Sequence, residues 1–128
     1  RTSETEVAEL VSDADKRFLL AEADGRLVGC ALIEKRGDEA YFGMLSIEPA
    51  LQGGGFGKAM IASIEAAAGE LWHSTAMTMV VINLREPLIA WYERRGYQRT
   101  GRTHPFPFGE STGETRRDFH LTELRKPL

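Results

Sequence analysis

One glycine-rich segment decides how this chain folds, and it reads Gln52-Gly53-Gly54-Gly55-Phe56-Gly57-Lys58. It lies between an apolar, strand-like run that ends at Ile47-Glu48-Pro49 and a helix-like run that starts near Lys58. Glycines permit a tight turn with positive φ, so successive backbone N–H groups can point into one concavity. The start of a helix adds unpaired N–H donors and the positive end of the helix dipole. A strand, a glycine turn and a helix in this order predict a site for a phosphorylated ligand.

The composition limits the class of protein. The chain has 128 residues, which suits one domain, and its 42% hydrophobic and 27% charged residues are ordinary for a globular protein. A net charge of −3 argues against a nucleic-acid partner, because no basic field is present to neutralise a phosphate backbone. No apolar run is long enough for a transmembrane helix and no signal peptide is visible, so we expect no membrane partner and a cytoplasmic location. The single cysteine, Cys30, lies in an apolar run and is expected to pack in the core.

Hydrophobic periodicity predicts a three-stranded meander in the first part of the chain. Strands are expected at residues 17–23, 27–34 and 40–48, and Asp24-Gly25 is typical of a type I′ hairpin turn. A short helix is expected at Glu6–Val11, before the first of these strands. Strict alternation along the third strand would put Tyr41, Gly43, Leu45 and Ile47 on one face.

The second part of the chain alternates helices and strands. Helical spacing of apolar residues runs from about residue 58 to residue 71, and a β-branched strand follows at 77–82. Pro87 is expected to open a second helix and Gly96 to close it. The last two strands are expected at 97–103 and 119–124. The order predicts a mixed α/β (α+β) domain with a mostly antiparallel, twisted sheet of about six strands and helices on both faces.

Spacing excludes two common phosphate-binding motifs. The Walker A motif requires glycine and serine or threonine where this chain has Gln52 and Ala59. The dinucleotide motif G-x-G-x-x-G also fails, because its last glycine would fall on a lysine when read from Gly53. The pattern that fits is Q/R-x-x-G-x-G/A, carried by Gln52, Gly55 and Gly57.

Two later features complete a family resemblance. A short strand ends at Asn83, and the helix after it carries the block Tyr92-Glu93-Arg94-Arg95-Gly96-Tyr97. Together with the glycine segment, in this order and at this separation, they resemble the GNAT superfamily of acetyl-CoA-dependent N-acetyltransferases. The resemblance covers roughly residues 17–124. It implies a GNAT-like sheet and acetyl-CoA as cosubstrate.

The resemblance also implies which residues bind coenzyme A. Its pyrophosphate would rest on the backbone of Gln52, Gly53, Gly54, Gly55, Phe56, Gly57 and Lys58. The pantetheine arm would pair like an added strand with the backbone of Leu45, Ser46 and Ile47. Asn83 matches a polar position at the end of the next strand. Tyr92 matches a tyrosine whose hydroxyl faces the thioester sulfur.

The reaction implied is direct attack of a primary amine on the thioester in a ternary complex. Tyr92 is the candidate acid for the leaving thiolate, and an N–H near Leu45 is the candidate donor to the oxyanion. For the base we favour Glu39 among the carboxylates of its strand, with His120 as another candidate. The three histidines have no metal-ligand spacing, so we expect no metal.

Four points stay open from the sequence alone. Tyr92 as ordinary core packing against Trp91, and Asn83 as a turn or cap residue, are the alternatives to functional roles. A non-catalytic acyl-CoA-binding regulatory module is the alternative to an enzyme. The acceptor, a small molecule or a peptide amine, is expected to contact the aromatic loop Phe106-Pro107-Phe108.

The beginning of the chain differs from the family pattern. We read residues 1–128 as a single acetyl-CoA-binding N-acetyltransferase domain, N-terminally incomplete, which lacks the family's first strand and helix. That would leave the strand at 17–23 with a bare edge. Because an uncovered edge strand favours association, a homodimer across this edge is expected if the chain is complete.

Overall fold

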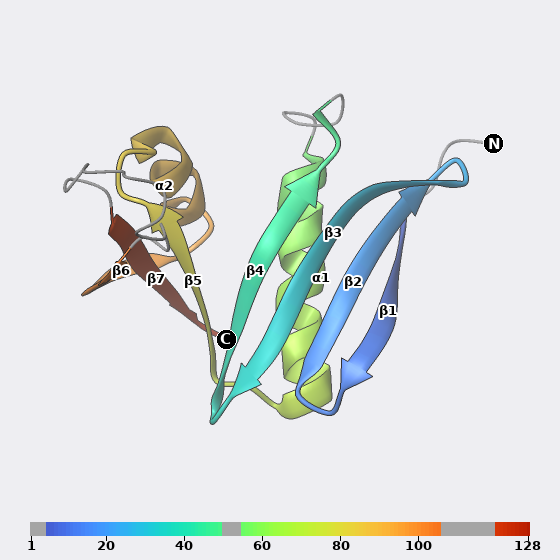
Figure 1. The fold of residues 1–128 in the computed structure, drawn as a ribbon, viewed down its shortest axis with the longest axis horizontal. Coiled ribbons are helices and arrows are strands. Elements are labelled where there is room, and N and C mark those ends of the chain that lie inside the picture. The colour runs from blue at the N-terminus through green and yellow to red at the C-terminus, as the bar shows by residue number, and fades with distance from the viewer. Residues whose placement is uncertain (1–4, 50–54, 106–119) are drawn as a thin grey trace, which may run out of the picture. The chain divides into compact units, whose positions relative to one another are not determined.

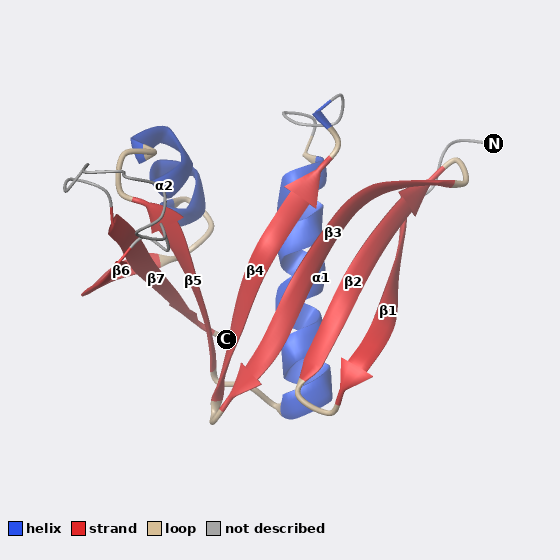
Figure 2. Ribbon diagram, in the orientation of Figure 1, coloured by secondary structure: helices blue, strands red, loops and turns tan. Residues whose placement is uncertain are grey.

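The structure is a computed structural model that describes residues 5–49, 55–105 and 120–128. Within these ranges the chain forms seven strands and two helices (Figures 1 and 2). The chain divides into two compact units, one of residues 1–77 with 127–128 and one of residues 78–126. No helix in the described ranges is long and apolar enough to cross a membrane.

The first unit is an antiparallel meander with one helix. Its elements are β1 (Thr5–Asp13), β2 (Lys16–Ala23), β3 (Arg26–Arg36), β4 (Glu39–Ile47), α1 (Phe56–Trp72) and the beginning of β5 (Ala76–Ile82). β1 pairs with β2, β2 with β3 and β3 with β4, each time antiparallel. The three strands predicted at 17–23, 27–34 and 40–48 are confirmed as β2, β3 and β4.

The hairpin between β2 and β3 has the predicted turn. Asp24 and Gly25 both have positive φ, 55° and 78°, as a type I′ turn requires. This turn has the right-handed twist of the flanking strands and therefore fixes their register.

Helix α1 covers one face of the meander. In Figure 1 it runs behind the strands, and it packs against β3 and β4. Its buried side chains recur at helical spacing; they are Met60, Ile61, Ile64, Ala67 and Ala68. The strands meet them with buried side chains at alternate positions; these are Leu19, Ala21, Ala31, Ile33, Ala40 and Phe42. Burial of this face is the main source of stability for the unit.

The C-terminal end of α1 is tied to the β1–β2 turn. The indole Nε1–H of Trp72 donates to the carbonyl of Ala14 at 3.2 Å. His73 then ends the helix in the left-handed conformation, with φ of 53°. Thr75, which follows, donates from its N–H to the carbonyl of Asp38 at 2.8 Å. These bonds hold the C-terminal end of α1 and the residues after it to the β1–β2 and β3–β4 turns.

The prediction of a helix at Glu6–Val11 is wrong, because β1 occupies these residues. So short a helix has little stability of its own, whereas a strand here gains a full ladder to β2 from Thr5 to Val11. The edge of β2 that the sequence led us to expect to be bare is therefore paired. The edge strand on this side of the sheet is β1 instead, so the expected homodimer across β2 would have to use β1.

The second unit contains the rest of β5, α2 (Glu86–Glu93), β6 (Gln98–Pro105) and β7 (His120–Pro127). β7 lies between β5 and β6 in strand order and pairs with β6 antiparallel. Pro87 lies in the first turn of α2 as predicted, and Gly96 follows the helix with a φ of 102°. Tyr97, the residue just before β6, is buried, and its N–H donates to the carbonyl of Tyr92 at 3.2 Å.

Candidate functional site

A β-bulge in β4 sets the geometry of the strand beside the glycine segment. Leu32 of β3 is opposite Gly43, and Cys30 is opposite Ser46. Ala31 alone is therefore opposite two residues of β4, at positions 44 and 45, so β4 has one extra residue there.

The bulge corrects the predicted faces of β4. Residues directly opposite each other in an antiparallel pair share a face, so Ser46 lies on the face of Gly43 and Cys30. Ile47, opposite Gly29, lies on the face of Phe42, which is the α1 face. Strict alternation predicted the reverse for both, because period-two reasoning cannot see an inserted residue.

The end of β4 is fastened to β3. The N–H of Glu48 donates to the carbonyl of Val28 at 2.8 Å. The guanidinium of Arg26 binds both carboxylate oxygens of Glu48, at 3.0 and 3.2 Å. This ion pair is exposed and by itself adds at most about 1 kcal/mol. Its geometric effect is to hold the end of β4 where the chain enters the glycine segment.

The described part of the glycine segment consists of Gly55 and the first turn of α1. Residues 52–54 of the predicted pyrophosphate seat lie outside the described residues. Gly55 has a φ of 87°, a conformation that favours glycine, and a Cβ added there would have no heavy atom within 4 Å. Gly55 has no side chain to cap the helix, and the first turn contains no acidic residue. The N–H groups at this helix start therefore meet no capping or acidic side chain of α1 itself, and Lys58 beside them is exposed.

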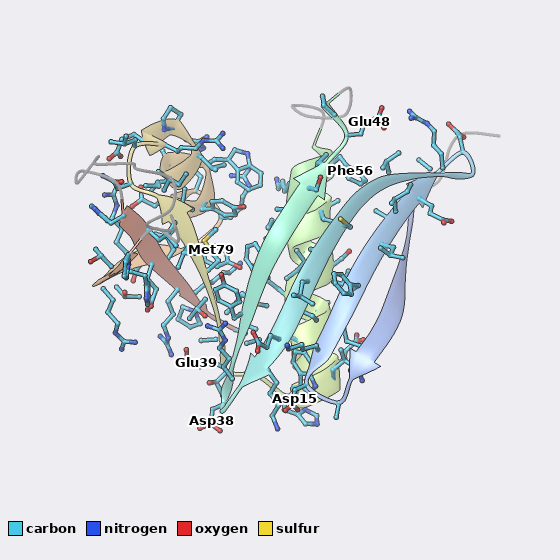
Figure 3. The ribbon with its side chains drawn as sticks, viewed as in Figure 1. Asp15, Asp38, Glu39, Glu48, Phe56 and Met79 are labelled. Carbon is cyan, nitrogen blue, oxygen red and sulfur yellow. The ribbon has the colours of Figure 1, made fainter. Side chains whose placement is uncertain are left out.

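The predicted base lies far from these residues along β4. Figure 3 shows Glu39 beside Asp38 at one end of the strand, with Glu48 and Phe56 at the other end. Leu45 is six positions beyond Glu39, which is at most about 20 Å at the rise of an extended strand. The strand therefore brings together Leu45, Ser46 and Ile47 but not Glu39.

Asn83, in the second unit, joins β5 to β7. Its N–H donates to the carbonyl of His120 at 2.9 Å, and its Oδ1 accepts the N–H of His120 at 3.0 Å. Asn83 is not the cap of α2, because that position belongs to Arg85. Its side chain thus fixes where β5 ends relative to β7.

Tyr92 is buried in the second unit, with 5% of its surface exposed. Its ring makes edge contacts with Trp91 and Tyr97, at centroid distances of 5.1 and 5.9 Å. Burial raises the pKa of the Tyr92 hydroxyl to about 12, against a smaller opposing effect of the Arg85 charge. The hydroxyl is therefore protonated at any physiological pH and can act as a hydrogen-bond donor.

The sequence did not predict a polar cluster around Glu123. Three residues of β6, at positions 100–102, are opposite this one residue of β7. His104 Nε2 lies 2.9 Å from the carboxylate, and Arg102 lies 3.6 Å from it. Burial alone would raise the pKa of Glu123, but hydrogen bonds from His104 and Thr100 and the charge of Arg102 outweigh it and lower the pKa. A carboxylate between Thr122 and Leu124 in a buried strand was the signal that sequence reasoning missed.

Two other side chains show no reactive setting. Cys30 is half-buried opposite Leu20 of β2 and lies on the sheet face away from α1, so it is not in the core as expected. His120 is half-buried, and it is the backbone of this residue that pairs with Asn83. Among the described residues, no group of three or more His, Cys, Asp or Glu side chains is arranged to hold a metal ion.

The fold is that of a mixed α/β protein in which a helix starts directly after a glycine turn, and a family comparison identifies its class. A family model described as an acetyltransferase (GNAT) domain matches residues 14–99. The chain therefore belongs to the GNAT acetyltransferase family and is an acetyl-CoA-dependent acyltransferase. A comparison of the sequence with curated proteins finds no match.

Solved structures show the same fold. A GNAT family acetyltransferase from Elizabethkingia anophelis with acetyl-CoA bound superposes with a TM-score of 0.80 at 11% identity, over 97% of this chain and 98% of that one. The IAA acetyltransferase from Bacillus cereus ATCC 14579 gives 0.77 at 14%, over 98% and 100%. The ribosomal-protein-S18-alanine N-acetyltransferase from Escherichia coli gives 0.74 at 14%, over 97% and 94%. The predicted GNAT-like mixed α/β fold is confirmed, with seven strands in the described ranges rather than about six.

Replacing Tyr92 with phenylalanine should make the protein less sensitive to alkali. The tyrosine ionises near pH 10 when unfolded and near 12 when folded, so its contribution is complete below pH 10 and is lost as the pH rises to 12. The free energy of unfolding of the wild type should fall by about 2–3 kcal/mol more than that of Tyr92→Phe over this range. Urea unfolding of both proteins between about pH 9 and 12 measures the difference. Equal pH dependence in the two proteins would contradict the burial argument.

Proposed function

We propose that the protein transfers the acetyl group of acetyl-CoA to a primary amine, by direct attack within a ternary complex. The observation that carries the proposal is the start of α1, which follows Gly55 and has no acidic or capping side chain in its first turn. A pyrophosphate is the kind of group such a helix start accepts. The proposal treats residues 1–128 as a single acetyltransferase domain.

The proposed seat of coenzyme A uses backbone groups in the first unit. The pyrophosphate would be bound by the N–H groups of residues 52–58, with Lys58 as an added charge. The pantetheine arm would run along Leu45, Ser46 and Ile47, where the bulge in β4 interrupts the regular ladder to β3. A backbone N–H at Leu45 is the proposed donor to the thioester oxygen as charge develops on it.

The chemical step needs a neutral amine. An alkylamine with a pKa of about 10 is neutral in roughly one molecule in a thousand at pH 7, so a proton must be removed before or during attack. The amine nitrogen forms a bond to the carbonyl carbon, the carbon–sulfur bond breaks, and the thiolate of coenzyme A leaves. The proton lost by the amine balances the one that the thiolate finally gains.

Tyr92 is proposed to stabilise the leaving thiolate by hydrogen bonding. A thiol has an ordinary pKa of about 8.5, well below the value of about 12 for the Tyr92 hydroxyl. Full proton transfer from Tyr92 would therefore be uphill by more than three pKa units, whereas a donated hydrogen bond has no such cost. Asn83, whose Oδ1 accepts the His120 N–H, is proposed to fix the end of β5 for the cosubstrate.

Glu39 is proposed to accept the proton of the amine indirectly, through water. At about 20 Å from Leu45 along β4, its carboxylate cannot contact an amine at the thioester. It is proposed as the end of a chain of waters that leads the proton away. A substitution at Glu39 should therefore leave the affinity for coenzyme A unchanged.

The acceptor is proposed to be a small-molecule or peptide amine. The fold is shared with an E. coli enzyme named for an alanine of a ribosomal protein, and primary amines are the acceptors that the direct-attack chemistry requires. The aromatic loop 106–108, proposed to contact the acceptor, lies outside the described residues. A cytoplasmic location belongs to the same proposal, since the single unpaired cysteine suits a reducing compartment.

Acetyl-CoA should stabilise the protein against heat and urea. At 100 times its dissociation constant the ligand should add about 2.7 kcal/mol to the free energy of unfolding. Lys58→Glu, in the first turn of α1, should weaken binding by about tenfold through charge repulsion. Ala62→Glu, exposed one turn further along the same helix, is the matched control and should bind normally. No stabilisation of the wild type at millimolar acetyl-CoA would contradict the proposal.

Release of thiol from acetyl-CoA should depend on an added amine. We expect intersecting double-reciprocal plots with the best acceptor from a panel of primary amines that includes a peptide with an N-terminal alanine. Tyr92→Phe should lower kcat by about 10- to 100-fold and leave the affinity for coenzyme A unchanged. Parallel plots would point to a covalent acyl-enzyme instead. Binding of acetyl-CoA without release of thiol by any amine would favour the alternative, a regulatory acyl-CoA-binding module.

Glu39→Gln should lower kcat/KM by about tenfold or less, with the largest effect at low pH, where the neutral amine is scarcest. Its matched control is Asp38→Asn, a neighbouring carboxylate in the β3–β4 turn. Initial rates across a pH series measure both variants. An unchanged kcat/KM for Glu39→Gln would remove this residue from the mechanism.

A further inference from the structure

The ring of Phe56 packs directly on the backbone of Gly29. Phe56 is the first residue of α1, and Gly29 is a buried residue of β3. A Cβ built at Gly29 would lie 3.1 Å from Cε2 and 3.4 Å from Cζ of the Phe56 ring. It would also lie 3.2 Å from the carbonyl oxygen of Ser46. Gly29 is not among the residues with positive φ, so close approach and not backbone conformation requires a glycine here.

This contact joins the glycine segment to the end of the β3–β4 ladder. Gly29 is opposite Ile47, the last residue of β4. The backbone bond from Glu48 to Val28 and the ion pair of Glu48 with Arg26 hold the same corner. Figure 3 shows Phe56 and Glu48 at this one end of the first unit.

A glycine segment needs such an anchor. Glycine loses more conformational freedom on ordering than any other residue, so Gly55 and Gly57 add little rigidity of their own to the start of α1. Phe56 lies between Gly55 and Gly57 and carries the large apolar side chain of this stretch. Its ring can fix the start of α1 against the sheet only because Gly29 has no side chain.

We infer that Gly29 and Phe56 are positioning residues for the pyrophosphate of coenzyme A, with Gly29 acting through Phe56 on the N–H groups of the first turn of α1. The inference rests on the proposed function of the glycine segment. It differs from ordinary core packing, because a misplaced helix start should weaken the binding of the pyrophosphate while the fold persists. A shift of about 1 Å in a binding group is enough to reduce its effect strongly.

The first experiment measures the dissociation constants of coenzyme A and of pantetheine, which lacks the pyrophosphate, by calorimetry and competition. Gly29→Ala should weaken coenzyme A by about tenfold or more and pantetheine by clearly less, the smaller loss arising because the new Cβ also lies 3.2 Å from the carbonyl oxygen of Ser46 in the proposed pantetheine seat. The matched control is Gly43→Ala in the neighbouring strand, where a Cβ would meet the Tyr41 ring at the same 3.1 Å. This control has a contact of the same closeness that does not involve α1, and it should bind coenzyme A normally.

The second experiment is a double-mutant cycle with Phe56→Leu, whose shorter side chain removes the outer ring atoms that the new Cβ would meet. Phe56→Leu alone should weaken coenzyme A by about threefold, and adding Gly29→Ala to it should cause a clearly smaller loss than Gly29→Ala causes in the wild type, because only the contact with the Ser46 carbonyl remains. If Gly29→Ala does not fold, Phe56→Leu still tests the inference by the same comparison of coenzyme A with pantetheine.

The outcomes separate the inference from the proposed function. A folded Gly29→Ala protein with wild-type affinity for coenzyme A would overturn the inference, as would additive effects in the double mutant. An equal loss of coenzyme A and pantetheine would also overturn it, because the effect would not be specific to the pyrophosphate. A wild-type protein that binds no coenzyme A would instead refute the proposed function, and the inference with it.

Discussion

The register of β4 on β3 is the constraint on which the rest of the first unit depends. The extra residue opposite Ala31 reverses the faces of everything that follows it in β4. After the bulge, Ser46 leaves the α1 face and Ile47 joins it, so the strand reaches its end opposite Gly29. That glycine then admits the Phe56 ring, and the helix begins from a fixed point. A local irregularity in pairing thus sets which residue of β4 lies opposite Gly29, and through Gly29 it bears on the start of α1.

The two units contribute by different physical means. In the first, the proposed binding of coenzyme A uses backbone groups. Two glycines serve it in different ways, because Gly29 allows the Phe56 ring to approach and Gly55 takes a positive φ. In the second, burial matters most, since it keeps the Tyr92 hydroxyl protonated far above neutral pH. Glu123 is a contrasting case, because several donors keep a nearly buried carboxylate charged. Backbone sites tolerate many sequences, whereas a buried hydroxyl depends on every neighbour that excludes water.

The sequence predicted elements whose signals are local. The turn at Asp24-Gly25 and the helix start after Gly55 follow from which residues accept positive φ. The errors came from pairing between strands, which local patterns do not encode. Residues 6–11 became a strand because β2 offered a ladder, and the faces of β4 changed because of one inserted residue. The cluster at Glu123 needs three residues of β6 opposite one of β7, which no spacing rule reveals. Glu39 was predicted as the base because it lies on the same strand as Leu45. The length of strand between them keeps its carboxylate from contacting the residues around Leu45.

The chain has two tryptophans, and each unit contains one of them. Trp72 donates its indole N–H to Ala14, while Trp91 lies under the guanidinium of Arg95, 4.3 Å from its ring. Their fluorescence therefore reports on two separate environments, and a Trp91→Phe protein would emit from the first unit alone. Fluorescence can be used to monitor the unfolding of Trp91→Phe and of the complementary Trp72→Phe. Comparison of the two curves reveals whether the two units unfold together or one after the other. Because each unit contains one tryptophan, intrinsic fluorescence can measure how cooperatively the two units unfold.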